Sequence, residues 1–298
     1  MRLLFIKSIL YACAYLPLPV IHAIGIGIGW GLILVPNRSR SSTEINIARC
    51  LPELSGREQR ALSRKSLLET GKTIIETSAL WFRSGKQSLR LIRKVDGNEM
   101  VEQAIAAGSG AILATPHLGS WEAAGLYGSA EFAITCLYRP LKIAEAEDLV
   151  RNARNRLGGN YVPANASGIR LVYKALEQGR VVAMLPDQEP QAGTGVYAPF
   201  FGIPAYSMVF LSRLSIRTGA PIIFAWCERL SWGRGYHLHF RSFSGVNKSS
   251  DIESNVAAVN MAVEQCVREC PEQYQWSYRR FKSRPEGESS FYKRQLPS

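Results

Sequence analysis

From Gly108 onward the chain alternates short apolar runs with helix-like stretches, and this alternation restricts the fold more than any other feature. Residues 111–115 are typical of a short buried strand, followed by a turn at Pro116 and a helix from about Ser120. The same reading predicts further strands near 133–138, 180–185, 221–226 and 235–243, and helices near 143–157, 168–178 and 207–218. Strands separated by helices predict an α/β fold, with a mainly parallel or mixed sheet flanked by helices.

The amino-terminal segment contrasts with this body, because no charged residue occurs between Ser8 and Pro36. Charged residues bracket the run on both sides: Arg2, Lys7, Arg38 and Arg40. A run of this length can span a bilayer, which requires about 20 apolar residues. Pro17 and Pro19 interrupt it, so a helical hairpin or a tilted interfacial insertion is a second possibility. We therefore predict a membrane-anchoring helical segment over residues 1–38.

Glycines at alternate positions within this segment superficially resemble a dinucleotide-binding loop. That fingerprint needs a preceding strand and an acidic residue about 20 positions later, and neither is clear here. The spacing instead places Gly25 with Gly29, and Gly27 with Gly31, on helix faces. Such faces favour close packing against another helix.

The rest of the chain divides simply. Residues 39–95 show helical spacing and predict helices packed over the entrance of the later sheet. Residues 39–282 are expected to form one main domain, and residues 283–298 are polar and predict a loose tail.

The formal net charge of +12 predicts an anionic partner, such as nucleic acid, acidic headgroups, phosphorylated substrates or an acidic carrier protein. No zinc-finger spacing, RNA-recognition motif or basic heptad region is present, so nucleic acid is not expected. The six cysteines include no C-x-x-C pair, and scattered reduced thiols favour a cytoplasmic position for the main domain. No metal-ligand cluster is evident, and no cofactor is predicted.

Polar side chains follow three of the predicted strands. His117, Arg139 and Asp187 each come within a few residues of a strand end. Functional residues of parallel sheets gather at the carboxyl ends of the strands, so these three are expected at one edge.

His117 and Glu122 are the predicted catalytic pair. They lie five positions apart across the turn from strand to helix, where the carboxylate is expected to reach one ring nitrogen. A histidine held in this way is a general base that can take a proton from an attacking alcohol. The competing interpretation is that His117 caps the helix while Glu122 only favours its dipole. The chain has no G-x-S-x-G nucleophile elbow.

A set of ordered motifs extends this interpretation: HLGSWE at 117–122, YRP at 138–140, LPDQ at 185–188, PFFG at 199–202 and QYQWSYRRFK at 273–282. Together they resemble the late lipid A acyltransferases, the lauroyl and myristoyl transferases of lipopolysaccharide synthesis. The resemblance covers nearly the whole chain. Ser120 departs from the Asn common in that family, and Ser207 from the Thr.

The resemblance implies an enzyme of the bacterial inner membrane whose catalytic domain, residues 39–282, faces the cytoplasm. Such enzymes move an acyl chain from acyl carrier protein to a hydroxyl of a Kdo-bearing lipid A precursor. By position, His117 and Glu122 would be catalytic. Arg139, Arg154, Asp187 and Gln188 would line the site by position, and Arg279 and Arg280, further along the chain, are also predicted to bind substrate.

Several of these residues also have purely structural interpretations. Phe200 and Phe201 could line an acyl groove, but they suit packing better. Arg279 and Arg280 belong to a basic strip that would hold headgroups or the acidic carrier if it lies at a membrane. Two other functions remain open: an acyltransferase that uses acyl-CoA and another glycolipid or aminolipid acceptor, and a non-catalytic lipid-binding protein.

Overall fold

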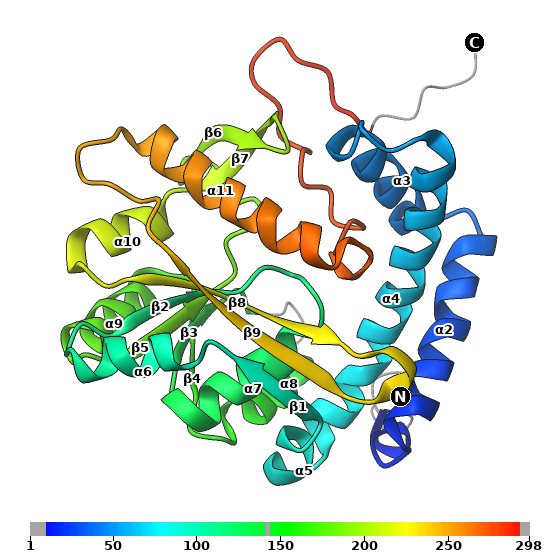
Figure 1. Ribbon diagram of the computed structural model, residues 1–298, viewed down its shortest axis with the longest axis horizontal. Coiled ribbons are helices and arrows are strands. Elements are labelled where there is room, and N and C mark those ends of the chain that lie inside the picture. Colours follow the sequence, from blue (N-terminus) through cyan, green and yellow to red (C-terminus); the bar gives the residue numbers. More distant parts are fainter. Residues whose placement is uncertain (1–9, 141–143, 293–298) are drawn as a thin grey trace.

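The computed structural model describes residues 10–140 and 144–292, and its centre is a seven-stranded mixed sheet (Figure 1). The strand order is β1-β9-β8-β2-β5-β3-β4, and all neighbouring pairs are parallel except β8 with β9. The strands are β1 Ile92–Asp96, β2 Ala111–Ala114, β3 Thr135–Tyr138, β4 Asn160–Pro163, β5 Val181–Met184, β8 Ile222–Arg229 and β9 Tyr236–Phe243. The predicted mainly parallel or mixed sheet is confirmed.

Helices cover both faces of this sheet. They are α2 Leu18–Leu34, α3 Arg38–Cys50, α4 Gly56–Phe82, α5 Gly85–Leu89, α6 Glu99–Ala106, α7 Trp121–Phe132, α8 Ala144–Asn155, α9 Ala166–Glu177, α10 Phe210–Thr218 and α11 Ile252–Glu269. Alternate residues of the central strands point to opposite sides. Ile112 and Phe224 pack in one core with α9, α10 and α11, whereas Leu113 and Ala225 pack in a second core with α4, α6 and α7.

Several elements were not foreseen from the sequence. Strand β1 ends the stretch expected to be helical, and β4 follows the predicted helix near 143–157. A separate antiparallel hairpin, β6 Gly195–Phe200 with β7 Ile203–Met208, takes the first residues of the helix predicted from 207. The long helix α11 packs against this hairpin (Figure 1).

Helix α2 packs along α4 rather than standing apart from the body (Figure 1). A Cβ atom on Gly25 or Gly29 would lie 2.6 Å from the α4 backbone, so the predicted close helix contact is confirmed for this pair. Gly27 and Gly31 face open space. The flanking Arg2 and Lys7, with Ser8, lie outside the described residues.

Membrane anchoring by residues 1–38 stays a prediction. No helix within the described part of the chain is by itself long and apolar enough to cross a bilayer. Taken together, α2 and α3, which meet at a bend of 83°, pass that test on length and composition.

Residues 283–292 are not the loose tail expected from their polarity. Arg284 donates to the carbonyl of Pro204 at 2.6 Å, and Tyr292 donates to the Asn46 side chain at 2.5 Å. Arg49 also lies over the Phe291 ring, at 3.8 Å from its centroid. This segment therefore closes over α3 and the hairpin, while residues 293–298 lie outside the described residues.

Candidate active site

The turn after β2 carries His117 and is held from several sides. Gly119 has φ +62°, and a Cβ atom there would lie 2.0 Å from the carbonyl oxygen of Cys227 on β8. Only glycine adopts this conformation at such a close approach without strain. The backbone of Gln275 donates to the carbonyl of His117 at 3.0 Å. The histidine is thus fixed by its own backbone as well as by its side chain.

Asp187 holds the imidazole. Its Oδ1 lies 2.8 Å from Nδ1 of His117, and its Oδ2 accepts from the backbone N–H of the same residue at 2.9 Å. Asp187 is buried, whereas the His117 side chain is partly exposed. Two contacts from one carboxylate fix both the position and the rotation of the ring. The convergence of these two strand ends is confirmed.

The other ring nitrogen faces an amide. Nε2 of His117 lies 3.1 Å from Nε2 of Gln188, which also donates to Oε1 of Gln275 at 3.0 Å. An amide N–H is a donor, so this arrangement fits the tautomer with the proton on Nδ1 and a lone pair on Nε2. The lone pair is the part of the ring that can accept a proton.

Glu122 does not make the contact expected of it. Among the described residues, both oxygens of its carboxylate accept hydrogen bonds from Arg154, and Arg154 Nε lies 3.1 Å from Oε2. Oε2 also accepts from Trp81 Nε1 at 3.1 Å. Glu122 lies in the first turn of α7, which carries it to α8 and α4 instead of back to the ring. The prediction that its carboxylate reaches a ring nitrogen of His117 is therefore wrong, and Asp187 takes that place.

Both carboxylates are nevertheless ionised. Burial alone would raise the pKa of Glu122, but the charge and hydrogen bonds of Arg154 outweigh it and hold the pKa below its ordinary value. Protonation of His117 would act in the same direction at longer range. Burial likewise opposes ionisation of Asp187, and the contacts with His117 lower its pKa. Two negative charges therefore lie near one imidazole.

A cavity of about 840 Å³ opens beside His117. Its polar lining includes His117, Glu122, Arg139, Arg154 and Gln188, and also Thr115, Asn165, Glu189, Gln191, Thr194 and Arg213. The remaining wall is largely apolar and continues beneath α7, where it is lined by Leu113, Gly125, Gly128, Ile134, Ala183, Ala225, Leu238 and Phe240. The volume lies within the range of ligand-binding pockets, and one apolar ligand with a polar end fits this distribution.

Four predicted binding residues line this cavity or hold its wall. Arg139, Arg154 and Gln188 line it directly, and Arg139 is exposed at its rim. Arg154 is partly buried, with its guanidinium committed to Glu122. Asp187 lies behind His117 and is not part of the wall.

The other four predicted binding residues lie elsewhere. Phe200 and Phe201 are buried in the main core with their ring centroids 4.9 Å apart, because the β6–β7 hairpin folds them inward. Arg280 is also buried and donates to the carbonyl of Tyr206 at 2.7 Å. Arg279 bonds Ser42 and lies over the Tyr292 ring. The structure gives these residues packing contacts, so the expected basic strip is not a continuous exposed surface.

Two residues of the site were missed. Gln275 contacts both the His117 backbone and Gln188, and its position inside the QYQWSYRRFK motif was the available signal. Trp81 lies in the stretch 39–95 predicted to be helical, and its indole N–H donates to Glu122 at 3.1 Å.

The structure also brings together three side chains of the types that bind metal ions, although the sequence predicts no such cluster. The ligand atoms of Asp96, His237 and His239 lie within 4.8 Å of one another. Asp96 is bonded by Lys94 at 2.6 Å as well as by His237 at 2.8 Å. These residues belong to β1 and β9, which β8 separates from β2 and His117.

This chain is similar in sequence to known acyltransferases. Residues 3–283 match the family described as bacterial lipid A biosynthesis acyltransferase. A lipid A biosynthesis lauroyltransferase of Escherichia coli K12 is 30% identical over 290 residues, covering 96% of this chain and 92% of the relative. A palmitoleoyltransferase of the same strain is 28% identical over 289 residues, with the same coverage. A phosphatidylinositol mannoside acyltransferase of Mycobacterium tuberculosis CDC 1551 is 28% identical over 184 residues, covering 60% of this chain and 55% of the relative.

Proposed function

Because the chain belongs to the family of bacterial lipid A biosynthesis acyltransferases, which are O-acyltransferases, we propose that it transfers a fatty acyl chain from acyl carrier protein to a hydroxyl of a Kdo-bearing lipid A precursor. The observation that carries this proposal is the juxtaposition of an oriented histidine with a deep apolar cavity. An acyl chain occupies the apolar part beneath α7, and its thioester carbonyl lies at the polar end beside His117.

In the proposed reaction, Nε2 of His117 removes the proton from the acceptor hydroxyl. The oxygen attacks the thioester carbonyl, the new C–O bond forms, and the C–S bond breaks. The proton passes from the imidazolium to the departing thiolate. Because Gln188 contacts Nε2, its amide must yield that position to the acceptor hydroxyl.

The two carboxylates have different roles in this proposal. Asp187 stabilises the imidazolium directly and keeps Nε2 directed away from itself. Glu122 acts at longer range through its charge and holds Arg154 at the cavity wall. The proposed catalytic group is thus His117 with both carboxylates.

Arg139 is the residue proposed to meet acceptor phosphate. It is exposed at the cavity rim, whereas the guanidinium of Arg154 is committed to Glu122. A guanidinium can bond two phosphate oxygens at once. The net charge of +12 also favours an acidic carrier protein as the donor.

We place the enzyme on the inner membrane with its catalytic domain facing the cytoplasm. In support, α2 exposes Ile24, Trp30 and Leu34, Val35 directly after it is also exposed, and Trp232 near its start is 88% exposed. An exposed apolar group of this kind favours contact with lipid tails.

A second acceptor class is favoured by one observation, the match to the phosphatidylinositol mannoside acyltransferase. Mass spectrometry of lipid A from cells with and without this protein distinguishes the two. The lipid A proposal requires loss of one acyl chain from lipid A when the protein is absent. Unchanged lipid A with a change in another glycolipid would instead support the second acceptor.

A further inference from the structure

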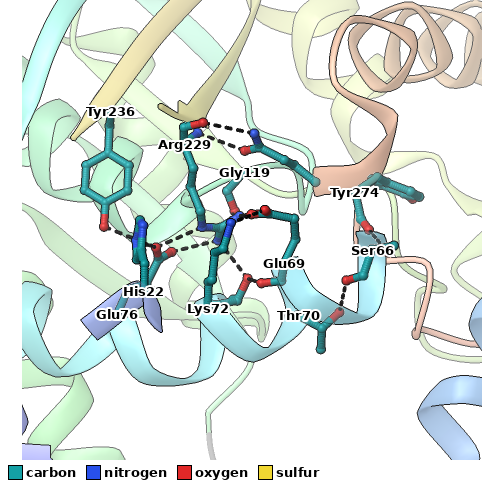
Figure 2. A network of polar contacts seen from close by, with 12 residues as sticks. His22, Ser66, Glu69, Thr70, Lys72, Glu76, Gly119, Arg229, Tyr236 and Tyr274 are labelled. Carbon is teal, nitrogen blue, oxygen red and sulfur yellow. Dashed lines mark hydrogen bonds and ion pairs between the residues drawn. The ribbon is translucent and has the colours of Figure 1, made fainter. Parts of the chain in front are cut away.

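The turn that carries His117 is stabilised by contacts from outside its own segment. The N–H of Gly119 donates to the carbonyl of Gln273 at 3.1 Å, and that of Ser120 donates to Cys227 at 2.7 Å. The carbonyl of Gly119 accepts from Nη2 of Arg229 at 2.8 Å (Figure 2). This carbonyl lies two residues after His117, so a shift of Arg229 moves the turn that sets the ring.

Arg229 is itself held in a fixed orientation. It is buried at the end of β8, and Glu76 of α4 accepts from its Nε at 2.8 Å and from its Nη2 at 2.7 Å (Figure 2). Nη2 also donates to Thr73 at 2.7 Å. Two parallel bonds fix the plane of a guanidinium, and the second hydrogen of Nη2 is shared between Thr73 and the Gly119 carbonyl.

Glu76 connects this arginine to helix α2. Nε2 of His22 lies 3.3 Å from Glu76 Oε2, and Tyr236 donates to the same oxygen at 3.2 Å (Figure 2). His22 is buried because Gly25 lets α2 approach the α4 backbone closely. A continuous series of polar contacts therefore runs from α2 through Glu76 and Arg229 to the turn.

We propose that Arg229 is a positioning residue for the acyl transfer reaction, which holds the Gly119 carbonyl and thereby His117, and that His22 and Glu76 make this geometry depend on the seating of helix α2. The inference rests on the proposed function in assigning the reaction to His117. The helix that exposes an apolar face to lipid then also supports the catalytic turn from its buried face.

Arg229→Lys in the full-length protein tests this directly. A lysine keeps the charge opposite Glu76, but one ammonium cannot reproduce the two-oxygen contact together with the bond to Gly119. In detergent micelles, with lauroyl-acyl carrier protein and a Kdo-bearing lipid A precursor, we expect kcat to fall roughly 10- to 100-fold. KM for both substrates should stay within about 2-fold, because Arg229 does not line the cavity.

Two further variants test the contacts that link Arg229 to helix α2. Glu76→Gln should lower kcat in the same way, since it releases the plane of the guanidinium. His22→Ala keeps the apolar face of α2 and should lower kcat by about 5-fold, the loss expected for one hydrogen bond. Membrane partitioning of His22→Ala should match that of the wild type.

Hydrogen exchange of residues 117–120 measures the turn independently of activity. The amides of Gly119 and Ser120 should exchange faster in Arg229→Lys, while β5 stays protected. Arg284→Lys is the matched control. Arg284 is also largely buried, and it also donates to the backbone carbonyl of a residue distant in sequence, Pro204. This control should leave kcat and exchange in the turn unchanged.

The outcomes separate the two proposals. If the wild-type protein transfers no acyl chain, the proposed function fails, and exchange in the turn alone decides the positioning role. If the wild type is active and Arg229→Lys keeps its kcat and its slow exchange, the inference is overturned. Faster exchange throughout the protein would mark a general loss of stability in the lysine variant, and the double variant described next then decides.

A poorly folding lysine variant still leaves a test. Replacing Glu76 and Arg229 together by Met removes both buried charges and can restore stability. A folded double variant with low kcat supports positioning, and one with wild-type kcat overturns it.

Discussion

Asp187→Asn tests which carboxylate serves His117. In the structure Asp187 makes two contacts with that residue, one to Nδ1 at 2.8 Å and one to the backbone N–H at 2.9 Å. Asparagine keeps one acceptor oxygen but loses the charge that stabilises an imidazolium. The substitution therefore destabilises the imidazolium that His117 forms when it accepts a proton, and it leaves the backbone at the end of β5 unchanged.

The size of the effect follows from these contacts. A hydrogen bond to a charged group contributes roughly 1.5–3 kcal/mol, so losing one such bond with the net charge should cost about 2–4 kcal/mol in the transition state. That range corresponds to a fall in kcat of about 30- to 1,000-fold. Asp187 does not line the cavity, so KM should change little.

Purified variants assayed with lauroyl-acyl carrier protein and a Kdo-bearing lipid A precursor give the answer. Glu264→Gln is the matched control, because its carboxylate also accepts from a backbone N–H, that of Phe201 at 2.6 Å, and lies outside the cavity wall. A kcat of Asp187→Asn within about 3-fold of the wild type would show that the Asp187 charge does not assist proton transfer to His117. In that case the orientation of His117 by Asp187 is not important for the reaction.

Three other predictions follow from the described contacts. Arg139→Gln should raise KM for a phosphorylated acceptor more than for its dephosphorylated form, and equal increases in a kinetic comparison would exclude phosphate recognition by Arg139. Ala183→Phe fills the apolar part of the cavity and should shift donor preference toward shorter acyl chains, measured by competition between donors; an unchanged preference would place the chain elsewhere. Burial opposes ionisation of Glu76, but Arg229 lowers the pKa of this carboxyl from 4.5 to about 2. Ionised Glu76 therefore contributes roughly 3 kcal/mol to the free energy of unfolding; this contribution is complete above pH 4.5 and is lost as pH falls toward 2. Urea unfolding should therefore show Glu76→Gln destabilised at pH 7 but much less so at pH 3, and a constant difference would contradict this sign.

The strand and helix pattern could be predicted because its signal is local. Strand β2 covers Ala111–Ala114, Ser120 precedes α7, and the turn between them presents His117 as expected. Strand β4 is only four residues long, and the β6–β7 hairpin carries Pro199 and Pro204 inside its strands, which weakens a strand pattern. Their stability comes from tertiary contacts.

The pairing of side chains was harder to predict. His117 and Glu122 are close in sequence, but helix α7 begins at Trp121 and directs Glu122 toward Arg154. Asp187 is 70 residues from His117 and reaches it only because β2 and β5 are neighbours in the sheet. The sequence indicated the correct edge of the sheet but not the contacts within it.

Charge was similarly misleading at the carboxyl-terminal motif. Arg280 appears in the sequence as part of an exposed basic strip, yet it is buried and bonds the carbonyl of Tyr206. In the core, Arg280 lies over the ring of Phe200, a contact between segments 80 residues apart. A local run of arginines does not show which of them a later turn will bury.

In the proposed reaction, His117 accepts the proton during acyl transfer to a lipid hydroxyl. The most direct test is to mix purified protein with lauroyl-acyl carrier protein and a Kdo-bearing lipid A precursor, and to follow the acylated product by mass spectrometry. The wild type should form a product heavier by one lauroyl group, and His117→Ala should form it about 100- to 10,000-fold more slowly while remaining folded. Near-normal product formation by His117→Ala would contradict the account.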